Sequence, residues 1–363
     1  MPDIHAAELH RLASDLLCAV GTEQTAAEIV ANSLVDANLA GHDSHGVLRL
    51  PAYLAGVRQG HVVPAAIPSL LSQSGATAIV DAADGWGQPA MWMATRAAID
   101  RAREYGLGAA VVHRSYHIGR VAPYVESIAH AGMIGQAMAN AAPAVAPFGG
   151  RSRVMGTNPM AWAVPRAVDQ PPICLDVATA GVAEGKLRVA RARGFPVPAG
   201  NIVDREGRPT TEPGDFYAGG ALLPFGGHKG SGFSLLAQFI GRGLAQMDPS
   251  GYDGPRGVNG PFILAIDIDR FTDLERFRAE VEAQCAAVTG SLPAEGVEAV
   301  LLPGQPELAM RITRERDGVP IPDSTWQELE ALAREHGVAL PSESVRSDSA
   351  ASETFQAYSH RAQ

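Results

Sequence analysis

The stretch Val121-Ala-Pro-Tyr-Val-Glu-Ser-Ile-Ala-His-Ala-Gly-Met-Ile-Gly-Gln-Ala-Met-Ala-Asn140 contains the two kinds of regular structure on which the fold depends. Residues 121–131 have the apolar spacing of a helix. Residues 133–140 form a short, smooth apolar run that predicts a buried strand. A helix that leads directly into a buried strand indicates a mixed α/β fold, in which helices cover a sheet.

The alternation continues on both sides of this stretch. Two amphipathic helices come first, over 9–20 and 25–39, and the second follows a capping-box pattern at Thr25-Ala-Ala-Glu28. We expect further helices over 88–105, 181–193, 231–246, 273–288 and 324–336, and further strands over 109–112, 172–177, 262–268 and 297–302. Taken alone, this alternation suggests a doubly wound sheet.

Length, charge and cysteine usage limit the class of protein. At 363 residues, the chain is long enough for two to three domains of about 150 residues each. Its net charge of -10 and the absence of Lys/Arg-rich runs argue against nucleic acid as a partner. Three scattered cysteines argue against a disulfide framework and fit a reducing, cytoplasmic compartment. No signal peptide or apolar run of membrane-spanning length is present, and residues 342–363 are polar enough to predict a flexible tail.

Several common catalytic and nucleotide-binding motifs are missing. The chain has no G-x-x-x-x-G-K-[ST], no H-E-x-x-H, no G-x-S-x-G and no G-x-G-x-x-G after a strand. Gly106-Leu-Gly108 runs from a helix into a strand, which is the reverse of the Rossmann order. Any nucleotide must therefore bind by another loop.

The sharpest local group of polar residues is Ser44, His45 and Arg49, in a short helix that Ser44 caps and Pro51 kinks or ends. His45 and Arg49 are four residues apart, so a helix places them on one face. A guanidinium beside a titratable imidazole suits a small carboxylate substrate, because arginine binds carboxylates with two parallel hydrogen bonds and histidine exchanges a proton near neutral pH. The same spacing also fits a solvated helix start.

Two further groups carry candidate chemistry. His113 and His117 follow a predicted strand, where catalytic residues, but also hydrogen-bonded structural histidines, are found. These two histidines could bind a metal together with His42 and His45, but no carboxylate stands at a regular ligand spacing from them. We therefore expect no metal. The glycine-rich segment 224–232, with Lys229, suits either an anion at a helix start or a plain tight turn.

Taken together, these segments resemble the malate/L-lactate dehydrogenase family that lacks a Rossmann fold, and within it the bacterial hydroxycarboxylate dehydrogenases. The matching blocks occur in family order from about residue 5 to 340: Ala37-Asn-Leu-Ala-Gly-His-Asp-Ser-His-Gly46, Ser115-Tyr-His-Ile-Gly-Arg120, Ala146-Pro-Phe-Gly-Gly150, Gly156-Thr-Asn-Pro159, Leu175-Asp-Val-Ala-Thr179, Gly185-Lys186, Gly227-His-Lys-Gly230 and Leu302-Pro-Gly304. No single block is specific, but the ordered set is.

The resemblance implies a mixed α/β fold with a mostly antiparallel NAD(P)-binding sheet inserted in a helical domain. Residues 1–75 and 295–341 would form a substrate and dimerisation domain, and residues 76–294 the cofactor domain. The family further implies a homodimer. For the sheet, we expect the mostly antiparallel arrangement of the family and not the doubly wound sheet.

The resemblance also implies roles for particular residues. Ser44, His45 and His117 would be catalytic, with His117 the proton acceptor in some relatives and His45 in others; we favour His45. Arg49, Thr157, Glu184, Gly185 and Lys186 would contact the substrate. The cofactor, NAD or NADP with NAD favoured, would contact His117, Ile118, Gly119, Arg120, Val121, Asn140, Leu175, Asp176, Val177, Ala178, Lys229, Pro303, Gly304, Gln305 and Pro306.

Three activities follow as alternatives. The first is hydride transfer between NAD(P) and a small 2-hydroxy acid such as malate, lactate, sulfolactate, ureidoglycolate or an aryl-lactate. The second is reduction of cyclic or N-alkyl imines of 2-oxo acids; imine reductases of the family carry His-Gly-Asp where this chain has Glu184-Gly-Lys186, which favours the first. Ala180 replaces a serine usual in relatives. The third is a non-catalytic nucleotide-binding or scaffold protein that has kept the fold, against which the intact Ser44, His45 and Arg49 speak.

Overall fold

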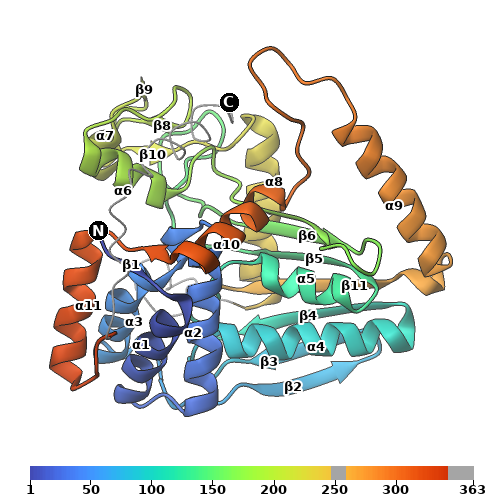
Figure 1. The fold of residues 1–363 in the computed structure, drawn as a ribbon, viewed down its shortest axis with the longest axis horizontal. Helices are drawn as coiled ribbons and strands as arrows, with labels where there is room; N and C mark the ends of the chain where they lie inside the picture. Colours follow the sequence, from blue (N-terminus) through green and yellow to red (C-terminus); the bar gives the residue numbers. More distant parts are fainter. Residues whose placement is uncertain (247–258, 342–363) are drawn as a thin grey trace.

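The computed structural model describes residues 1–246 and 259–341. Its N-terminal part is a helical layer of α1 (Ala6–Ala19), α2 (Gln24–Leu39) and α3 (Leu50–Arg58), against which the last described helix, α11 (Asp323–His336), packs (Figure 1). The short strands β1 (Asp3–Ile4) and β12 (Val319–Pro320) pair antiparallel and join the start of the chain to the segment before α11. Buried leucines of α1, α2, α3 and α11 form one continuous apolar cluster, so the first and last segments share a core.

The central element is a seven-stranded sheet. It contains β2 (Ser69–Ser74), β3 (Thr77–Asp81), β4 (Leu107–His113), β11 (Pro261–Asp267), β5 (Met133–Ala139), β6 (Met160–Val164) and β7 (Ile173–Val177), in that spatial order. Only β3 and β4 pair in parallel; the other neighbours are antiparallel. The mostly antiparallel sheet is therefore confirmed, and the doubly wound arrangement suggested by the alternation alone is wrong.

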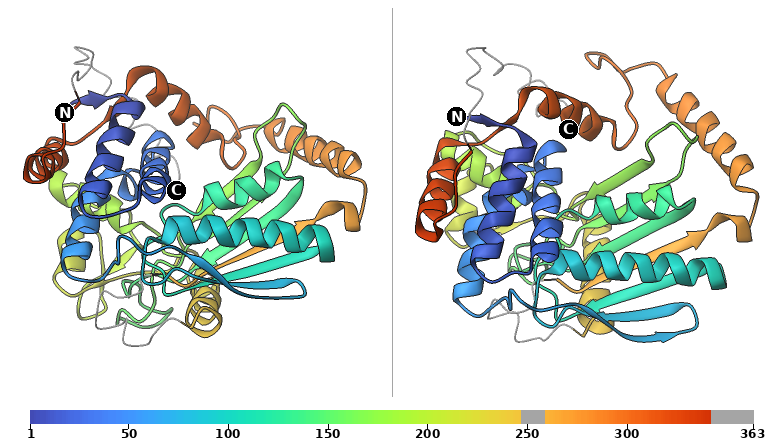
Figure 2. Two further views of the ribbon diagram at one scale, coloured as in Figure 1. Left: turned by 90° about the horizontal axis from the view of Figure 1, so that it is seen from below. Right: turned by 60° about the horizontal axis from the view of Figure 1, so that its bottom comes forward.

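The sheet has unlike faces. Helices α4 (Gly87–Tyr105) and α5 (Ala122–His130) cover one face, where alternate small residues of the strands are fully buried (Figure 2). These small side chains let the helices approach closely; a methyl group built on Gly108 would lie 1.9 Å from the Ala98 carbonyl oxygen. On the other side lies α8 (His228–Phe239), which continues into a π-helical turn, η3 (Ile240–Leu244).

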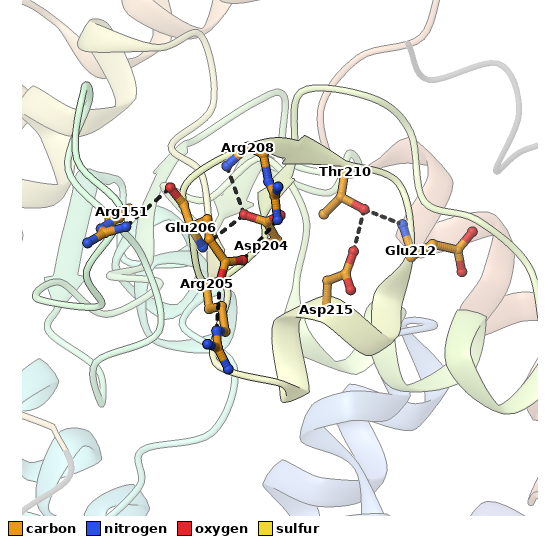
Figure 3. A network of polar contacts seen from close by, with 8 residues as sticks. All are labelled: Arg151, Asp204, Arg205, Glu206, Arg208, Thr210, Glu212 and Asp215. Carbon is orange, nitrogen blue, oxygen red and sulfur yellow. Dashed lines mark hydrogen bonds and ion pairs between the residues drawn. The ribbon is translucent and has the colours of Figure 1, made fainter.

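A smaller layer stands beside the end of the large sheet. It consists of the three-stranded sheet β10 (Ala221–Leu222), β8 (Ile202–Val203) and β9 (Pro209–Thr210), with α6 (Glu184–Arg193) and α7 (Pro213–Tyr217). A polar network stabilises the β8–β9 hairpin (Figure 3). In it the Asp204 carboxylate accepts the backbone N–H groups of Glu206 and Arg208 at 2.9 Å each. Within this layer, the small sheet and α7 support α6, whose first turn reaches the candidate site.

Most predicted elements are confirmed within one to three residues, but three details are wrong. Residues 297–302 form no strand; they lie in the irregular segment between α9 (Leu274–Thr289) and α10 (Gln305–Asp317). Thr25 does not cap α2, because the Glu23 carboxylate accepts the Ala26 N–H instead. Pro51 does not kink its helix: it occupies the first turn of α3, where its missing N–H costs nothing.

Some expectations lie at or beyond the limits of the described residues. The predicted tail, 342–363, lies outside them. Within the described part of the chain, no helix is both long and apolar enough to cross a membrane. Cys18, Cys174 and Cys285 are free thiols.

Candidate active site

The site is built around a rigid turn that follows α2. Two short 3-10 helices, η1 (Asp43–His45) and η2 (Val47–Arg49), are separated by an extended Gly46. The buried Asn38 side chain joins them, since it donates to Asp43 at 2.7 Å and accepts the Val47 N–H at 2.9 Å. A methyl group on Gly46 would lie 2.2 Å from the Asn38 amide oxygen, so only glycine fits here.

Ser44, His45 and Arg49 come together, but not for the reason that their spacing suggests. The chain is not α-helical here, so the expected shared helix face is absent, and Ser44 lies within η1 and caps no α-helix. Instead, Arg49 Nε donates to the Ser44 carbonyl at 2.7 Å, while Ser44 Oγ lies 3.0 Å from His45 Nδ1. The turn thus presents one guanidinium and one imidazole side by side.

His117 reaches the same place from the loop after β4. Its ring stacks on that of His45, with 5.6 Å between ring centroids and 28° between planes. His113, four residues earlier, is separate: its Nε2 lies 3.2 Å from the carbonyl of Leu244 in η3. Of the two histidines that follow the predicted strand, only His117 therefore belongs to the site.

Two site residues were missed by sequence reasoning. Tyr53 of α3 places its hydroxyl 2.7 Å from His117 Nδ1, and the buried Gln88 of α4 donates to that hydroxyl at 3.0 Å. Tyr53 ends the polar segment that begins at His42, a weak signal. Gln88 shows none, since it is one polar residue at the start of an ordinary amphipathic helix.

Both imidazoles are neutral at neutral pH. Burial, and next the positive charge of Arg49, lower the pKa of His45 to about 3. The same two causes hold the pKa of His117 well below its usual range. Burial likewise raises the pKa of the Tyr53 hydroxyl. The site therefore contains one fixed positive charge and two uncharged proton-exchanging rings.

Helix α6 closes the site from the smaller layer. A methyl group built on Gly185 would lie 2.4 Å from Ser44 Cβ, so the first turn of α6 rests directly on the turn 43–49. Glu184 is turned toward its own layer, where it accepts hydrogen bonds from Tyr217 and Arg188. Lys186 is exposed. The Thr157 carbonyl accepts hydrogen bonds from both the backbone N–H and the side-chain hydroxyl of Thr179.

Residues 117–121 are the expected cofactor loop. Two residues for which the family resemblance implied cofactor contacts, Asp176 and Arg120, anchor this loop to its neighbours. The Asp176 carboxylate accepts the N–H groups of Val121 and Ala122 at 2.8 Å each, where α5 begins. Arg120 is buried and pairs with Asp36 of α2 at 2.8 Å. The loop is thus tied to both β7 and α2.

Asn140 anchors the same loop indirectly. Its carbonyl accepts from Asn259 at 2.6 Å, and the Asn259 side chain accepts the Ile118 N–H at 3.1 Å. The Asn140 amide oxygen also accepts the Gly260 N–H at 2.7 Å. These contacts of Asn140 hold β5, β11 and the loop together.

The remaining expected cofactor residues fall into two groups. The segment 303–306 lies beside β7, since a methyl group on Gly304, which starts α10 at φ +91°, would lie 3.4 Å from the Cys174 carbonyl. Leu175 and Val177 alternate with Asp176 along β7, so they point to the opposite face, and Ala178 follows. Lys229 is exposed in the first turn of α8, and it forms no ion pair with any other described residue.

The comparisons with known proteins agree with this arrangement over nearly the whole chain. A family model described as malate/L-lactate dehydrogenase matches residues 4–330. The L-lactate dehydrogenase of Cupriavidus necator is 35% identical over 339 residues, which are 91% of this chain and 97% of that protein. Hydroxycarboxylate dehydrogenase B of Escherichia coli K12 is 33% identical over 349 residues, which are 94% and 96% of the two chains.

Further matches extend to a reductase and to a solved structure. The Delta(1)-pyrroline-2-carboxylate/Delta(1)-piperideine-2-carboxylate reductase of Pseudomonas syringae pv. tomato is 34% identical over 320 residues, 86% of this chain and 91% of that protein. The sulfolactate dehydrogenase from Methanocaldococcus jannaschii superposes with a TM-score of 0.85 at 31% identity, covering 93% and 98% of the chains. The similarity includes the turn, the loop and the helices that build the site.

Proposed function

Because this chain belongs to the malate/L-lactate dehydrogenase family, we propose that it is an NAD(P)-dependent dehydrogenase of small 2-hydroxy acids. One observation carries the proposal: two neutral histidines are stacked 5.6 Å apart beside the guanidinium of Arg49. Such a group suits an anionic acid whose neighbouring hydroxyl loses a proton. Since the chain carries a net charge of -10, attraction of the anion must be local.

The residues around the loop 117–121 fit a dinucleotide. Gly119 has φ +74°, and a methyl group there would lie 2.5 Å from Ser33 Oγ, so the loop offers bare backbone at this point. The buried Arg120 Nε has no hydrogen-bond partner among the described residues, and the N-termini of α5 and α10 both lie beside β7. Residues 117–121, 175–178, 303–306 and Lys229 would hold the nicotinamide dinucleotide, which when bound supplies the hydride acceptor.

In the proposed reaction, each side chain has one task. Arg49 binds the substrate carboxylate and orients the carbon that loses hydride. His45 accepts the hydroxyl proton at Nε2, with its Nδ1 hydrogen directed to Ser44 Oγ. Its low pKa keeps the acceptor lone pair free, and the arriving negative charge of the substrate stabilises the imidazolium that forms.

Imine reduction is the second candidate, and the 34% identical pyrroline-carboxylate reductase is the observation in its favour. The residues in the first turn of α6 favour a hydroxy acid over an imine as the substrate. The position at which imine reductases of the family carry aspartate is Lys186, and Glu184 is occupied by Tyr217 and Arg188. No carboxylate of that turn is left to support a protonated histidine.

The experiment is a turnover assay of the purified chain with NAD and with NADP. Malate, lactate, sulfolactate, ureidoglycolate and aryl-lactates are compared with cyclic imines and with 2-oxo acids plus methylamine. The proposal expects turnover of at least one hydroxy acid, strongly reduced in His45→Gln. Turnover of imines alone supports the second candidate, and cofactor binding without any turnover supports a non-catalytic protein.

We further propose that the chain acts as a cytoplasmic homodimer. Large apolar side chains are exposed on α8 and η3: Phe233, Leu235, Leu236, Phe239 and Leu244. The sheet face on the same side as α8 adds a row of partly buried residues, Val111, Phe262, Met138 and Met160. A monomer rarely exposes such surface, whereas a homodimer buries it. Phe239→Asp should dissociate the dimer in sedimentation experiments, while Val168→Asp, at an exposed apolar residue outside this surface, should not.

A further inference from the structure

Tyr53 is held in one orientation by its neighbours. Its ring is buried and packs on Trp86 and Tyr116, at centroid distances of 5.3 Å and 5.7 Å. Trp86 is itself fixed by a 2.9 Å hydrogen bond from its indole N–H to Thr22. The phenol therefore has little freedom, and its hydroxyl stays 2.7 Å from His117 Nδ1.

A backbone amide indicates which nitrogen of His117 carries the proton, and at 3.2 Å it is a weaker partner of Nδ1 than the Tyr53 hydroxyl at 2.7 Å. The Gly119 N–H donates to His117 Nδ1 at 3.2 Å. An amide N–H only donates, so Nδ1 must be the unprotonated nitrogen of the neutral ring. The ring proton is then on Nε2, and Tyr53 donates its hydroxyl hydrogen to Nδ1.

Gln88 sets the direction of the Tyr53 hydroxyl. The Gln88 side-chain amide donates to the Tyr53 oxygen at 3.0 Å, which leaves the hydroxyl hydrogen free to point at His117. Gln88 is fully buried, and its Oε1 has no hydrogen-bond partner among the described residues. A buried acceptor without a partner is costly, so what this amide contributes to the cluster is its donor atom.

We propose that Tyr53 and Gln88 are positioning residues that keep His117 in the Nε2–H form, which makes His117 a hydrogen-bond donor and leaves His45 as the proton acceptor. This inference rests on the proposed function. When the hydroxy acid is oxidised, its O–H bond breaks and an N–H bond forms at His45 Nε2. The two electrons leave C2 as hydride for the bound dinucleotide, and His117 Nε2–H donates to the oxygen that becomes the carbonyl.

The first test does not depend on turnover. Nitrogen-15 NMR of histidine-labelled protein reports which ring nitrogen carries hydrogen, and His117→Asn identifies the resonances among the 11 histidines. We expect Nδ1 of His117 to be unprotonated in the ligand-free protein. A proton on Nδ1 would overturn the inference. A lack of any turnover would instead count against the proposed function, and the NMR result could still be interpreted because it does not depend on turnover.

Variants separate positioning from mere packing. Tyr53→Phe keeps the ring but removes the donor, and Gln88→Glu supplies an acceptor that draws the hydroxyl away from His117. Both should mix the His117 tautomers and lower kcat about 10-fold, the value of one hydrogen bond to a reacting group, with KM little changed. Tyr116→Phe, in the same cluster but not bonded to His117, is the matched control. If Tyr53→Phe leaves both tautomer and kcat unchanged, Tyr53 is only a packing residue.

Discussion

Gly185 rests on Ser44: a methyl group at the glycine would lie 2.4 Å from the serine Cβ, closer than any two carbon atoms approach without displacement. The contact joins two parts of the chain that are far apart in sequence, the turn after α2 and the first turn of α6. A shift of α6 toward the turn must therefore displace Ser44, and with it the hydrogen bond to His45.

Gly185→Ala should lower kcat/KM by about 10- to 100-fold, because a displacement of Ser44 by a fraction of an ångström disturbs His45. Alanine is otherwise favoured in a helix, so the loss reports the clash and not helix propensity. Steady-state kinetics check this prediction. The control is Gly214→Ala in α7, where a methyl group meets nothing within 4 Å and activity should be unchanged. Equal activity of the two variants would contradict the role of the contact.

Arg314→Leu should destabilise the protein by about 2–4 kcal/mol, since it leaves the Asp43 carboxylate without its main partner. Arg314 of α10 is buried, donates to both Asp43 oxygens and also to the Asn38 carbonyl, so it holds the turn that carries Ser44 and His45. Urea unfolding measures the loss. Arg316→Leu removes an exposed guanidinium paired with Asp317 and should change stability by less than about 0.5 kcal/mol.

The stability of the protein should rise with pH between about 3 and 6.5 in part because of His45. Folding lowers the pKa of His45 from 6.5 to about 3, so in this window the unfolded chain binds a proton that the native chain does not. Stability is lost as pH falls through the window, by about 1.4 kcal/mol per unit for one fully differential proton. Unfolding of wild type and His45→Gln at pH 7 and pH 5 tests this. The variant should show the smaller pH dependence, and parallel curves would refute the assignment.

Asp176→Ala should cost about 1–3 kcal/mol, because the Val121 and Ala122 N–H groups lose their acceptor at the start of α5. The same loop is proposed to hold the cofactor, so its KM should rise. Asp176→Asn keeps an amide oxygen in place and should retain most of both properties. Thermal unfolding and cofactor titration distinguish the pair. If Ala and Asn behave alike, the carboxylate acts on the cofactor directly and not through the loop.

Four of the seven strands of the large sheet, β4, β5, β7 and β11, were predicted from local pattern, whereas β2, β3 and β6 were missed. The stretches 133–140 and 262–268 are short apolar runs with buried alternate residues, and they became β5 and β11. Their partners could not be predicted in this way, because an antiparallel pair and a parallel pair bury the same face of a strand. Residues 297–302 show the reverse error: an apolar run without a neighbouring strand stays irregular.

By itself, the sequence determined which polar residues cluster along the chain, and the resemblance of its ordered motifs pointed to the family. Tertiary structure alone decided how these residues act. Tyr53 and His117 are 64 residues apart, and Ser44 and Gly185 farther still, yet their atoms are in contact. The tautomer of an imidazole depends on which donors surround it, and those donors come from α3, α4 and the loop after β4. Spacing in the sequence encodes faces of one helix or strand, whereas hydrogen-bond direction arises only where several elements meet.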